Sequence, residues 1–241
     1  MKLLRNTTAA IVVAALGLTL LLLLYAMLRD RPEDLPWTKL DLSQPVGLFT
    51  GRKLAALADD FPACRKALDG AGVRYTVLAP LSEESGKCGY EDAVRFRAGG
   101  PRRIGLAPSD LGMACPVAAA LTVWEWEVVQ PAAQRHFGQK VAEIEHFGSY
   151  NCRRMYNREG ASWSEHATAD AVDVAAFRLA DGTRITLVGD WEAKGSKARF
   201  LRDVRDGACG TFSTVLSPDY NAAHRDHFHL DQAKRMWLVC R

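Results

Sequence analysis

Three of the six histidines of this chain lie within six residues, in the stretch HRDHFHL at 224–230. His227 and His229 are two residues apart, so on a β-strand both side chains would point to one face. A fourth histidine, His166, stands seven residues before Asp173. Two histidines and an aspartate form a donor set that zinc accepts, and a catalytic zinc keeps one further position for water. The residues alone therefore predict a metal site, with a solvated polar strand as the alternative.

The segments around these residues predict how they would be positioned. The stretch 170–191 is typical of a β-hairpin, because two runs of β-forming residues flank ADGT and Asp-Gly is a strong turn signal. We therefore expect His166 on a loop that enters the sheet and Asp173 on the first strand. The stretch 226–232 has the alternation of a strand, which could be a neighbour of the strand that carries Asp173.

The rest of the chain indicates a mixed fold. Helices are expected at 51–70 (interrupted at Pro62), at 114–138 (kinked or split at Pro131, closed by Gly138) and at 196–207 (with Gly207 past its end). Strands are expected at 73–80 and 140–150, and the stretch 82–100 is expected to be mostly loop. Because helices and strands do not alternate regularly, we predict an α+β fold, an antiparallel β-sheet with flanking helices. His136 and His146 stand apart, and we expect ordinary surface or core histidines there.

Residues 7–28 contain no charge, and 22 helical residues span roughly 33 Å, enough to cross a bilayer core. We interpret residues 1–28 as a single transmembrane anchor; a cleaved signal peptide is the alternative. The positive residues Lys2 and Arg5 favour a cytoplasmic N-terminus, which places the domain outside the cytoplasm, in the periplasm or its equivalent. A proline-containing linker at 29–46 would tether the domain, residues 47–241, to the cytoplasmic membrane.

All six cysteines lie beyond this anchor, and none forms a CxxC pair. In an exported domain such cysteines are typical of three disulfides, although buried free thiols are the alternative. Fifteen pairings are possible in principle. Sequence order favours Cys64 with Cys88, Cys115 with Cys152 and Cys209 with Cys240. The net charge of +3 and the absence of a basic run do not indicate a nucleic-acid partner, and the oligomeric state is open.

The pattern S-x-H-x6-D followed by H-x-H, here Ser164, His166, Asp173, His227 and His229, resembles the signature of a zinc peptidase superfamily. That superfamily contains lysostaphin, the D-Ala-D-Ala metallopeptidases and hedgehog domains. The longer context, FGSYNCRRMYN, SWSEHATADAVDV and HRDHFHLD, resembles the bacterial extensin-like C-terminal domain, over roughly residues 45–241. One departure is Ala169, where many relatives carry glycine. The resemblance implies a D-Ala-D-Ala metallopeptidase/hedgehog-like fold with an N-terminal subregion at 47–110 and a catalytic core at 111–241.

The resemblance also implies roles for individual residues. His166, Asp173 and His229 would bind zinc, while His227 would stay off the metal. Endopeptidases of the superfamily have a histidine at the position of His224, and the carboxypeptidases have a glutamate at the position of Asp226. The general base is therefore open between His227 and Asp226, with alternation favouring His227.

Further residues would support the reaction. His224 or an arginine could stabilise the oxyanion, and Asp190 or Glu165 could orient a ligand histidine. A set of three residues would contact substrate: Ser164 of the motif, and Tyr150 and Arg153 as loose counterparts of an S-G-Y-R segment.

The implied function is a zinc-dependent peptidase that cleaves peptidoglycan stem peptides or cross-links, as a D,D-endopeptidase or a carboxypeptidase. Two alternatives are a zinc-containing cell-wall binding or scaffolding module without turnover, and a polysaccharide-binding protein with a fortuitous histidine cluster.

Overall fold

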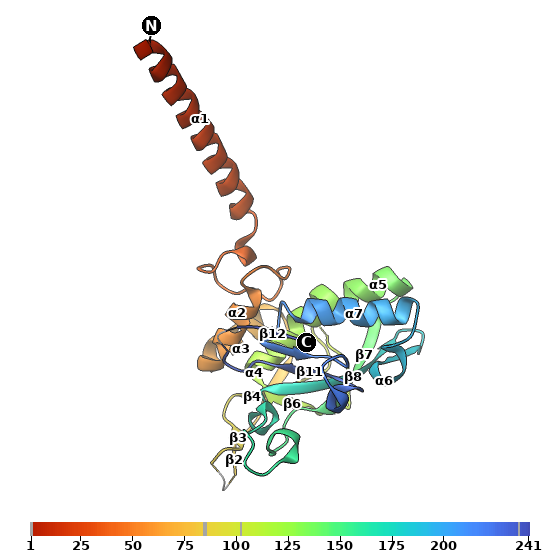
Figure 1. Cartoon of the computed structure of the whole chain (residues 1–241). Helices are drawn as coiled ribbons and strands as arrows, with labels where there is room; N and C mark the ends of the chain where they lie inside the picture. The colour runs from red at the N-terminus through yellow and green to blue at the C-terminus, as the bar shows by residue number, and fades with distance from the viewer. Residues whose placement is uncertain (1, 84–85, 102, 236) are drawn as a thin grey trace.

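The computed structural model of the chain describes residues 2–83, 86–101, 103–235 and 237–241. One long helix, α1 (Lys2–Arg29), projects away from a folded body (Figure 1). Within the stretch Asn6–Arg29, the mean hydropathy reaches 2.7. By length and composition α1 is therefore able to cross a membrane, as the sequence predicts.

The first helical region of the body is interrupted close to the predicted point. It consists of α2 (Thr50–Ala55), the 3-10 turn η2 (Ala56–Asp59) and α3 (Phe61–Gly70). The break lies at Asp60, whose carboxylate accepts a hydrogen bond from the N–H of Ala63 and so caps α3. Pro62 lies in the first turn of α3, where a missing N–H costs no hydrogen bond.

The long central helix contains a distortion ahead of its proline. It begins as α4 (Cys115–Trp124), passes through a π-turn, η3 (Glu125–Val129), and continues as α5 (Gln130–Phe137). The π-turn directly precedes Pro131 and widens the hydrogen-bonding pattern there, so the helix is distorted but not broken. Gly138, at φ 66°, ends it as predicted.

The last long helix, α7 (Ser196–Ala208), follows a single turn, α6 (Leu187–Asp190). The prediction that Gly207 lies past the end of this helix is wrong. Gly207 is inside α7, and a Cβ at this position would lie 2.2 Å from Cγ1 of Val128. The glycine permits close packing of α7 on η3. Four 3-10 turns complete the helical elements: η1 (Pro32–Asp34), η4 (Met155–Asn157), η5 (Glu165–Thr168) and η6 (Ala222–His224).

Within the described residues the largest sheet has the strand order β12-β10-β11-β8-β7-β5, with β9 also paired to β8. Its members are β5 (Leu106–Ala107), β7 (Val141–Gly148), β8 (Ala171–Leu179), β9 (Arg184–Thr186), β10 (Thr214–Leu216), β11 (Phe228–Asp231) and β12 (Val239–Cys240). The central pairings are antiparallel, and only the β5–β7 and β10–β12 pairings are parallel. The predicted α+β class with an antiparallel sheet is confirmed.

Smaller sheets occupy the N-terminal part of the body. One contains β1 (Tyr75–Val77), β4 (Ala93–Phe96) and β6 (Gly112–Ala114), and the other contains β2 (Leu81–Ser82) and β3 (Gly89–Tyr90). The expectation that 82–100 is mostly loop is therefore wrong in part, since it includes β3 and β4. The second arm of the predicted hairpin is also shorter than expected, because the chain turns into α6 after Thr186.

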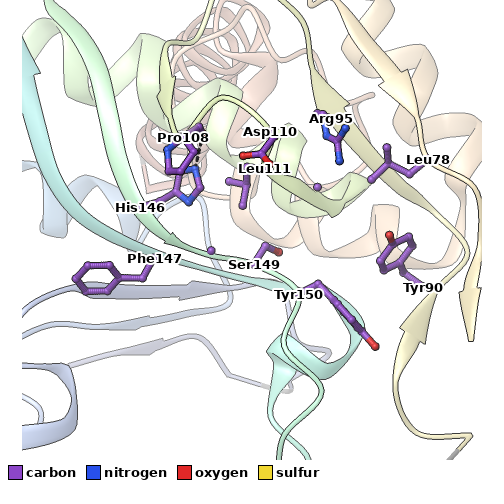
Figure 2. A pocket seen from close by; sticks show the side chains of 12 residues that line it. Leu78, Tyr90, Arg95, Pro108, Asp110, Leu111, His146, Phe147, Ser149 and Tyr150 are labelled. Atoms are coloured by element: carbon purple, nitrogen blue, oxygen red, sulfur yellow. Dashed lines mark hydrogen bonds between the residues drawn. The ribbon is translucent and has the colours of Figure 1, made fainter. Parts of the chain in front are cut away.

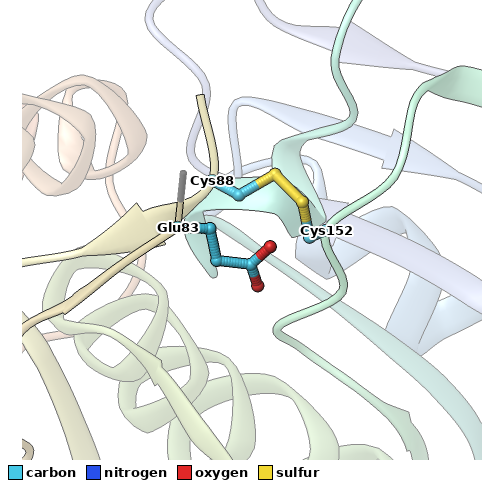
Figure 3. Close-up of side chains that lie close together, drawn as sticks. All are labelled: Glu83, Cys88 and Cys152. Atoms are coloured by element: carbon cyan, nitrogen blue, oxygen red, sulfur yellow. A yellow bond between two sulfur atoms is a disulfide. The ribbon is translucent and has the colours of Figure 1, made fainter. Parts of the chain in front are cut away.

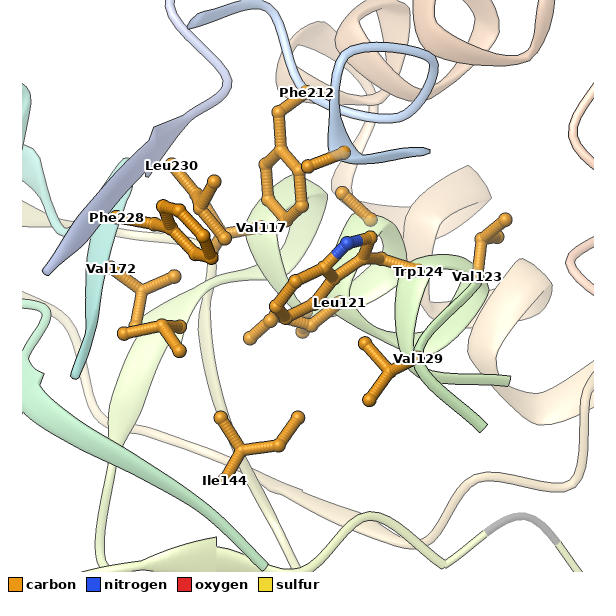
Figure 4. Packing of buried hydrophobic residues seen from close by; sticks show 14 of the residues in the cluster. Val117, Leu121, Val123, Trp124, Val129, Ile144, Val172, Phe212, Phe228 and Leu230 are labelled. Carbon is orange, nitrogen blue, oxygen red and sulfur yellow. The ribbon is translucent and has the colours of Figure 1, made fainter. Parts of the chain in front are cut away.

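The core lies between the sheet and the helices on one of its faces. Trp124 of α4 is fully buried and its indole N–H donates to the carbonyl of Val204 in α7, at 2.8 Å. Its ring lies 5.9 Å from that of Phe177 in β8. Figure 4 shows α4 residues meeting Val172, Phe228 and Leu230 of the sheet. Alternate residues of β8 and β11 thus face the helices, and those between them face the other way.

Three disulfides join the six cysteines, and two differ from the expected pairing. Cys209–Cys240 is confirmed, but Cys64 pairs with Cys115 and Cys88 with Cys152. Pairing by sequence order fails because α3 packs on α4, which brings Cys64 to the start of α4. The β2–β3 hairpin in turn meets the loop after β7. Each of the two unexpected bonds ties the N-terminal subregion to the core.

Candidate metal centre

Two adjacent strands and one preceding turn bring His166, Asp173 and His229 together. β8 and β11 are neighbours, and in their register His229 lies directly opposite Asp173. Both residues are flanked by core residues that face the helices, so both side chains lie on the opposite face of the sheet. His166 comes from η5, just before β8. The predicted placement, with the histidine on an entry loop and the aspartate on the first strand, agrees with the structure.

The turn between His166 and β8 explains the departure at Ala169. Ala169 ends η5 with φ 60°, a left-handed conformation that favours glycine. It is fully buried, and its carbonyl accepts hydrogen bonds from the Ser149 hydroxyl and the Ala114 N–H. The glycine of the resembling proteins suits this turn, and alanine, whose Cβ is small, adopts the same conformation here.

The three side chains present one atom each to a common centre. His166 Nε2, Asp173 Oδ1 and His229 Nδ1 are separated by 3.1 Å in all three pairs. Ligand atoms about 2.0–2.1 Å from a tetrahedral zinc ion lie about 3.3 Å apart. The triangle is thus slightly smaller than one face of a zinc coordination tetrahedron. These three residues form a group that could hold a metal ion.

The outer hydrogen bonds of the two rings determine where their lone pairs point. His166 Nδ1 lies 2.6 Å from the carbonyl oxygen of Ser149, which can only accept, so Nδ1 carries the proton. His229 Nε2 lies 3.2 Å from a carboxylate oxygen of Asp231 and carries the proton by the same logic. In the neutral rings, His166 Nε2 and His229 Nδ1 therefore offer lone pairs. Together with the Asp173 carboxylate they form three acceptors facing each other, an arrangement that a cation between them would stabilise.

Burial and charge at the cluster act in opposite directions. Burial would lower the pKa of His229, but hydrogen bonds with Asp173 and Asp231 outweigh it and raise that pKa to about 9. Burial would raise the pKa of Asp173, yet its hydrogen bonds with His166 and His229 hold that pKa well below the usual range of a carboxyl group. Without a metal ion, the aspartate thus favours a proton on His229. A bound divalent cation would take the place of that proton.

His227 stands at the rim of the triangle and is held by Asp226. Its Nδ1 lies 2.8 Å from Asp226 Oδ1, so the ring donates to this carboxylate. Its Nε2 lies 3.6 Å from Asp173 Oδ1, beside the cluster. Asp226 lies two residues before β11 and binds the ring nitrogen that points away from the cluster. The two candidates for the general base are thus hydrogen-bonded to one another, with the histidine nearer the triangle.

His224 completes the rim, and its protonation is determined by a neighbouring amide. Asn221 Oδ1 accepts from the N–H of Ala223, and the same oxygen lies 2.8 Å from His224 Nδ1. Nδ1 must therefore carry the proton, which leaves Nε2 with a lone pair. Burial, followed by the charges of His227 and His229, lowers the pKa of His224 to about 4. At neutral pH this ring is an acceptor, which does not suit the predicted role in stabilising an oxyanion.

A cleft of ≈ 390 Å³ opens onto the cluster. Of the predicted substrate contacts, Arg153 and Ser164 line it, and the Ser164 hydroxyl also accepts the N–H of His166. Glu165, predicted as a possible orienting residue, lines the cleft too and lies 3.7 Å from Arg235. Exposed Tyr156 and Tyr220 give this cleft an aromatic edge.

Tyr150, the third predicted substrate contact, lies outside this cleft. It lines a separate pocket of ≈ 350 Å³ together with Arg95, Asp110 and His146, as Figure 2 shows. Exposed Phe147 lies at the boundary, because it lines this pocket and its ring is 5.8 Å from that of His227. Phe147 therefore lies between the cleft at the cluster and the second pocket.

Other predicted residues have structural partners. The prediction that Asp190 orients a ligand histidine is wrong, because its carboxylate accepts from the N–H of Thr186 and lies 3.5 Å from Lys197. His136 pairs with Asp203, at 2.8 Å, as expected of a surface histidine. His146 Nε2 donates to the carbonyl of Pro108, also at 2.8 Å.

Two residues that orient the histidines of the triangle were missed in the sequence. Asp231, 1% exposed, orients His229, and the Ser149 carbonyl orients His166. Asp231 carried a usable signal, since it follows His229 by two residues and a strand places both on one face. The backbone carbonyl of Ser149 carried none, because any residue could supply it.

Comparison with known proteins identifies a family. A family model described as extensin-like protein C-terminus matches residues 62–241. No curated protein and no solved structure matches the chain. The match includes every residue of the triangle and its rim.

Proposed function

The chain belongs to the extensin-like protein C-terminus family, and we propose that it is a zinc-dependent peptidase that cleaves peptidoglycan stem peptides or cross-links. One observation carries the proposal. Three lone-pair donors in a 3.1 Å triangle lie beside a histidine whose far nitrogen is bound to a carboxylate. A metal site for structure alone is closed by a fourth ligand, whereas this one opens on a cleft that contains an oriented base.

The residues divide the work of hydrolysis as follows. Zinc, held by His166, Asp173 and His229, supplies Lewis acidity toward water and the scissile carbonyl. His227 Nε2 takes a proton from the attacking water and returns it to the leaving amine. Asp226 accepts the Nδ1–H of His227 throughout, which fixes the tautomer and stabilises the imidazolium that forms between the two transfers.

Charge on the substrate oxygen needs a donor within the cleft. Neutral His224 presents a lone pair there, so Arg153 is the better candidate among the predicted residues. The lone pair of His224 would instead accept a hydrogen bond from water or from a substrate N–H. His224 and His227, whose ring centroids are 5.2 Å apart, would then contact the same reacting region.

The compartment is consistent with this substrate. Three disulfides are typical of a domain outside the cytoplasm, and α1 is able to anchor it to the cytoplasmic membrane. The peptides of the cell wall lie in that compartment. We therefore propose a single-pass protein with its cleft facing the wall.

The decisive experiment measures metal and cleavage on the same preparation. The oxidised full chain is purified in detergent, its zinc content is determined, and peptidoglycan digests are analysed by mass spectrometry. We expect about one zinc per chain and fragments with new amine ends. Zinc without cleavage on walls of different cross-link chemistry would indicate the binding or scaffolding module instead, and no zinc would reject the site.

Two variants separate the base from its partner. His227→Ala should retain zinc and lose activity by about 10²–10⁴-fold, the usual contribution of a general base. Asp226→Asn should retain zinc with a smaller loss in kcat, because the imidazole base remains and loses only the carboxylate that fixes its tautomer and stabilises its charge. His136→Ala, which removes a histidine paired on the surface with Asp203, is the matched control and should leave both properties unchanged. A larger loss in Asp226→Asn than in His227→Ala would move the base to Asp226.

A further inference from the structure

The segment between α1 and the body is folded onto the body. Leu42 is 1% exposed and belongs to the main core. The ammonium group of Lys53 donates to the Thr38 hydroxyl at 2.8 Å, and the N–H of Leu48 donates to Asp34 at 2.8 Å. A side chain at Gly47 would collide with Asp34. Residues 32–49, which include most of the predicted linker at 29–46, are thus held in place on the body by specific contacts.

This folded segment follows α1 almost without a break. α1 ends at Arg29 and η1 begins at Pro32. The N–H of Arg31 bonds to the carbonyl of Leu28, and the N–H of Asp34 bonds to that of Arg31. Because an extended chain covers at most about 3.6 Å per residue, Pro32 lies within about 11 Å of Arg29 in any conformation of these residues. A membrane that contains α1 must therefore lie next to this end of the body.

Large apolar side chains are exposed at the same end. Trp37 is 77% exposed, Leu48 82%, Trp237 71% and Leu238 47%. Leu238 lies beside Gly51 at the start of α2, and Leu48 lies two residues before α2 begins. Trp37 precedes Thr38, which Lys53 of α2 holds. Figure 1 shows α2 and β12 close to the foot of α1.

The chemistry of this face matches a lipid headgroup region. Tryptophan is enriched at membrane interfaces, where its ring contacts acyl chains and its N–H contacts polar groups. Exposed cations, Arg31 and Arg52, lie on the same segments and suit lipid phosphates. The other exposed large apolar residues of the body include Phe147, Tyr156 and Tyr220, which belong to the clefts described above.

We propose that Trp37, Leu48, Trp237 and Leu238 form a membrane-contact face that rests on the phospholipid surface of the bilayer spanned by α1. This inference depends on α1 being in the membrane and is independent of peptidase activity. The face and the folded segment together would hold the domain against the membrane in one orientation.

Tryptophan fluorescence of the full chain tests the proposal directly, because α1 contains no tryptophan. The chain is reconstituted, one copy per nanodisc, in phosphatidylcholine with brominated acyl chains, which quench only nearby indoles. We expect strong quenching relative to unbrominated lipid, and the double variant Trp37→Phe, Trp237→Phe should lose more than half of it. Trp163→Phe, at the cation–π contact with Arg154 in the loop after β7, is the control and should quench like the wild type.

Three results would overturn the proposal. Equal quenching in the double variant and the wild type would show that the face stands away from the lipid. Loss of the quenching when several chains share a disc would assign the face to a second copy of the chain, which shields the indoles from lipid. Release of the chain by alkaline carbonate would show that α1 is not inserted, and would remove the premise while leaving the zinc and cleavage assays unaffected.

Discussion

Within the part of the chain that the structure describes, two places bring three potential metal ligands together, and only one of these two has free lone pairs. His166, Asp173 and His229 form one group, and Glu83, Cys88 and Cys152 form the other. In the second group the two sulfur atoms are bonded to each other, as Figure 3 shows, and Glu83 accepts the hydroxyl of Tyr150. In the first group the outer nitrogen of each ring donates to an oxygen, so the inner nitrogens present lone pairs beside the Asp173 carboxylate. Proximity is common to both groups, and the state of the donor atoms distinguishes them.

The largest effect is expected on the zinc content, when one of the three donors of the first group is removed. His229→Ala takes away one of three donors, and the zinc content should fall from about one to below about 0.1 per chain, measured by elemental analysis after gel filtration. His136→Ala should keep the wild-type content. An unchanged content in His229→Ala would mean that zinc, if bound, is held elsewhere.

Removing the Cys88–Cys152 disulfide of the second group should lower the stability of the fold and leave metal binding unchanged. Cys88→Ser with Cys152→Ser opens a link across 64 residues and should cost about 2–5 kcal/mol of unfolding free energy, measured by denaturant titration. The zinc content should not change, since neither sulfur belongs to the site. Cys209→Ser with Cys240→Ser, across 31 residues, should cost about 0.6 kcal/mol less on chain entropy alone. Loss of zinc in the first double variant would make the disulfide part of the site.

Asp231→Asn tests whether the outer hydrogen bonds prepare the ligands. The amide would weaken the acceptor at His229 Nε2, so zinc affinity should fall by about 10–100-fold in competition with a chromophoric chelator. Asp226→Asn, which alters a carboxylate on the non-ligand His227, is the control and should leave the affinity unchanged. Equal affinities in all three proteins would show that Nδ1 of His229 is oriented by packing alone.

The smallest expected effect is a pH dependence of folding stability, which arises from a carboxyl group located between the two groups of potential ligands. Asp170 lines a cavity next to Cys88 and Glu165, and burial raises its pKa to about 7. A carboxyl group with a raised folded-state pKa stabilises the fold below its unfolded-state pKa, near 4, and this contribution is lost as pH rises through about 7. Asp170→Asn should therefore melt a few degrees higher than the wild type at pH 8 and show no gain at pH 4, by calorimetry with saturating zinc.

The control for this measurement is the substitution Asp206→Asn, because Asp206 is an exposed aspartate on α7. It should change the melting temperature by the same amount at pH 4 and at pH 8. A constant difference between Asp170→Asn and the wild type from pH 4 to pH 8 would contradict the assignment of the titrating group to Asp170.

Sequence reasoning reached the parts of the site that depend on local periodicity. The two-residue spacing of His227 and His229 and the β-pattern after Asp170 follow from how side chains alternate on a strand. The direct pairing of Asp173 with His229 did not follow, because register depends on contacts between distant segments. The same holds for Cys64–Cys115, which required knowing that α3 packs on α4. Local pattern thus predicts which strand face Asp173 and His229 of the triangle occupy, whereas their proximity depends on tertiary pairing of the strands.

The fold beyond the site was predictable to a similar extent. Long helices, such as 114–138 and α7, form close to where the pattern places them. Short strands such as β3 and β4 were hidden in a stretch rich in polar residues and glycine. Gly207 was misread as a helix end because its role is to admit Val128, a contact that only packing reveals.

With α1 in a membrane, the folded segment at residues 32–49 would also restrict how far the domain can reach. β2 and β3 lie at the end of the body opposite α1 in Figure 1, and Cys88–Cys152 ties the loop beside the cleft to that hairpin. A domain mounted in this way cannot swing through a volume as one on a long flexible arm would. Its cleft would travel with the lipid in two dimensions, at one height above the bilayer. Only the layer of cell wall at that height would be processed, and the size of the folded body would set the distance of this layer from the bilayer.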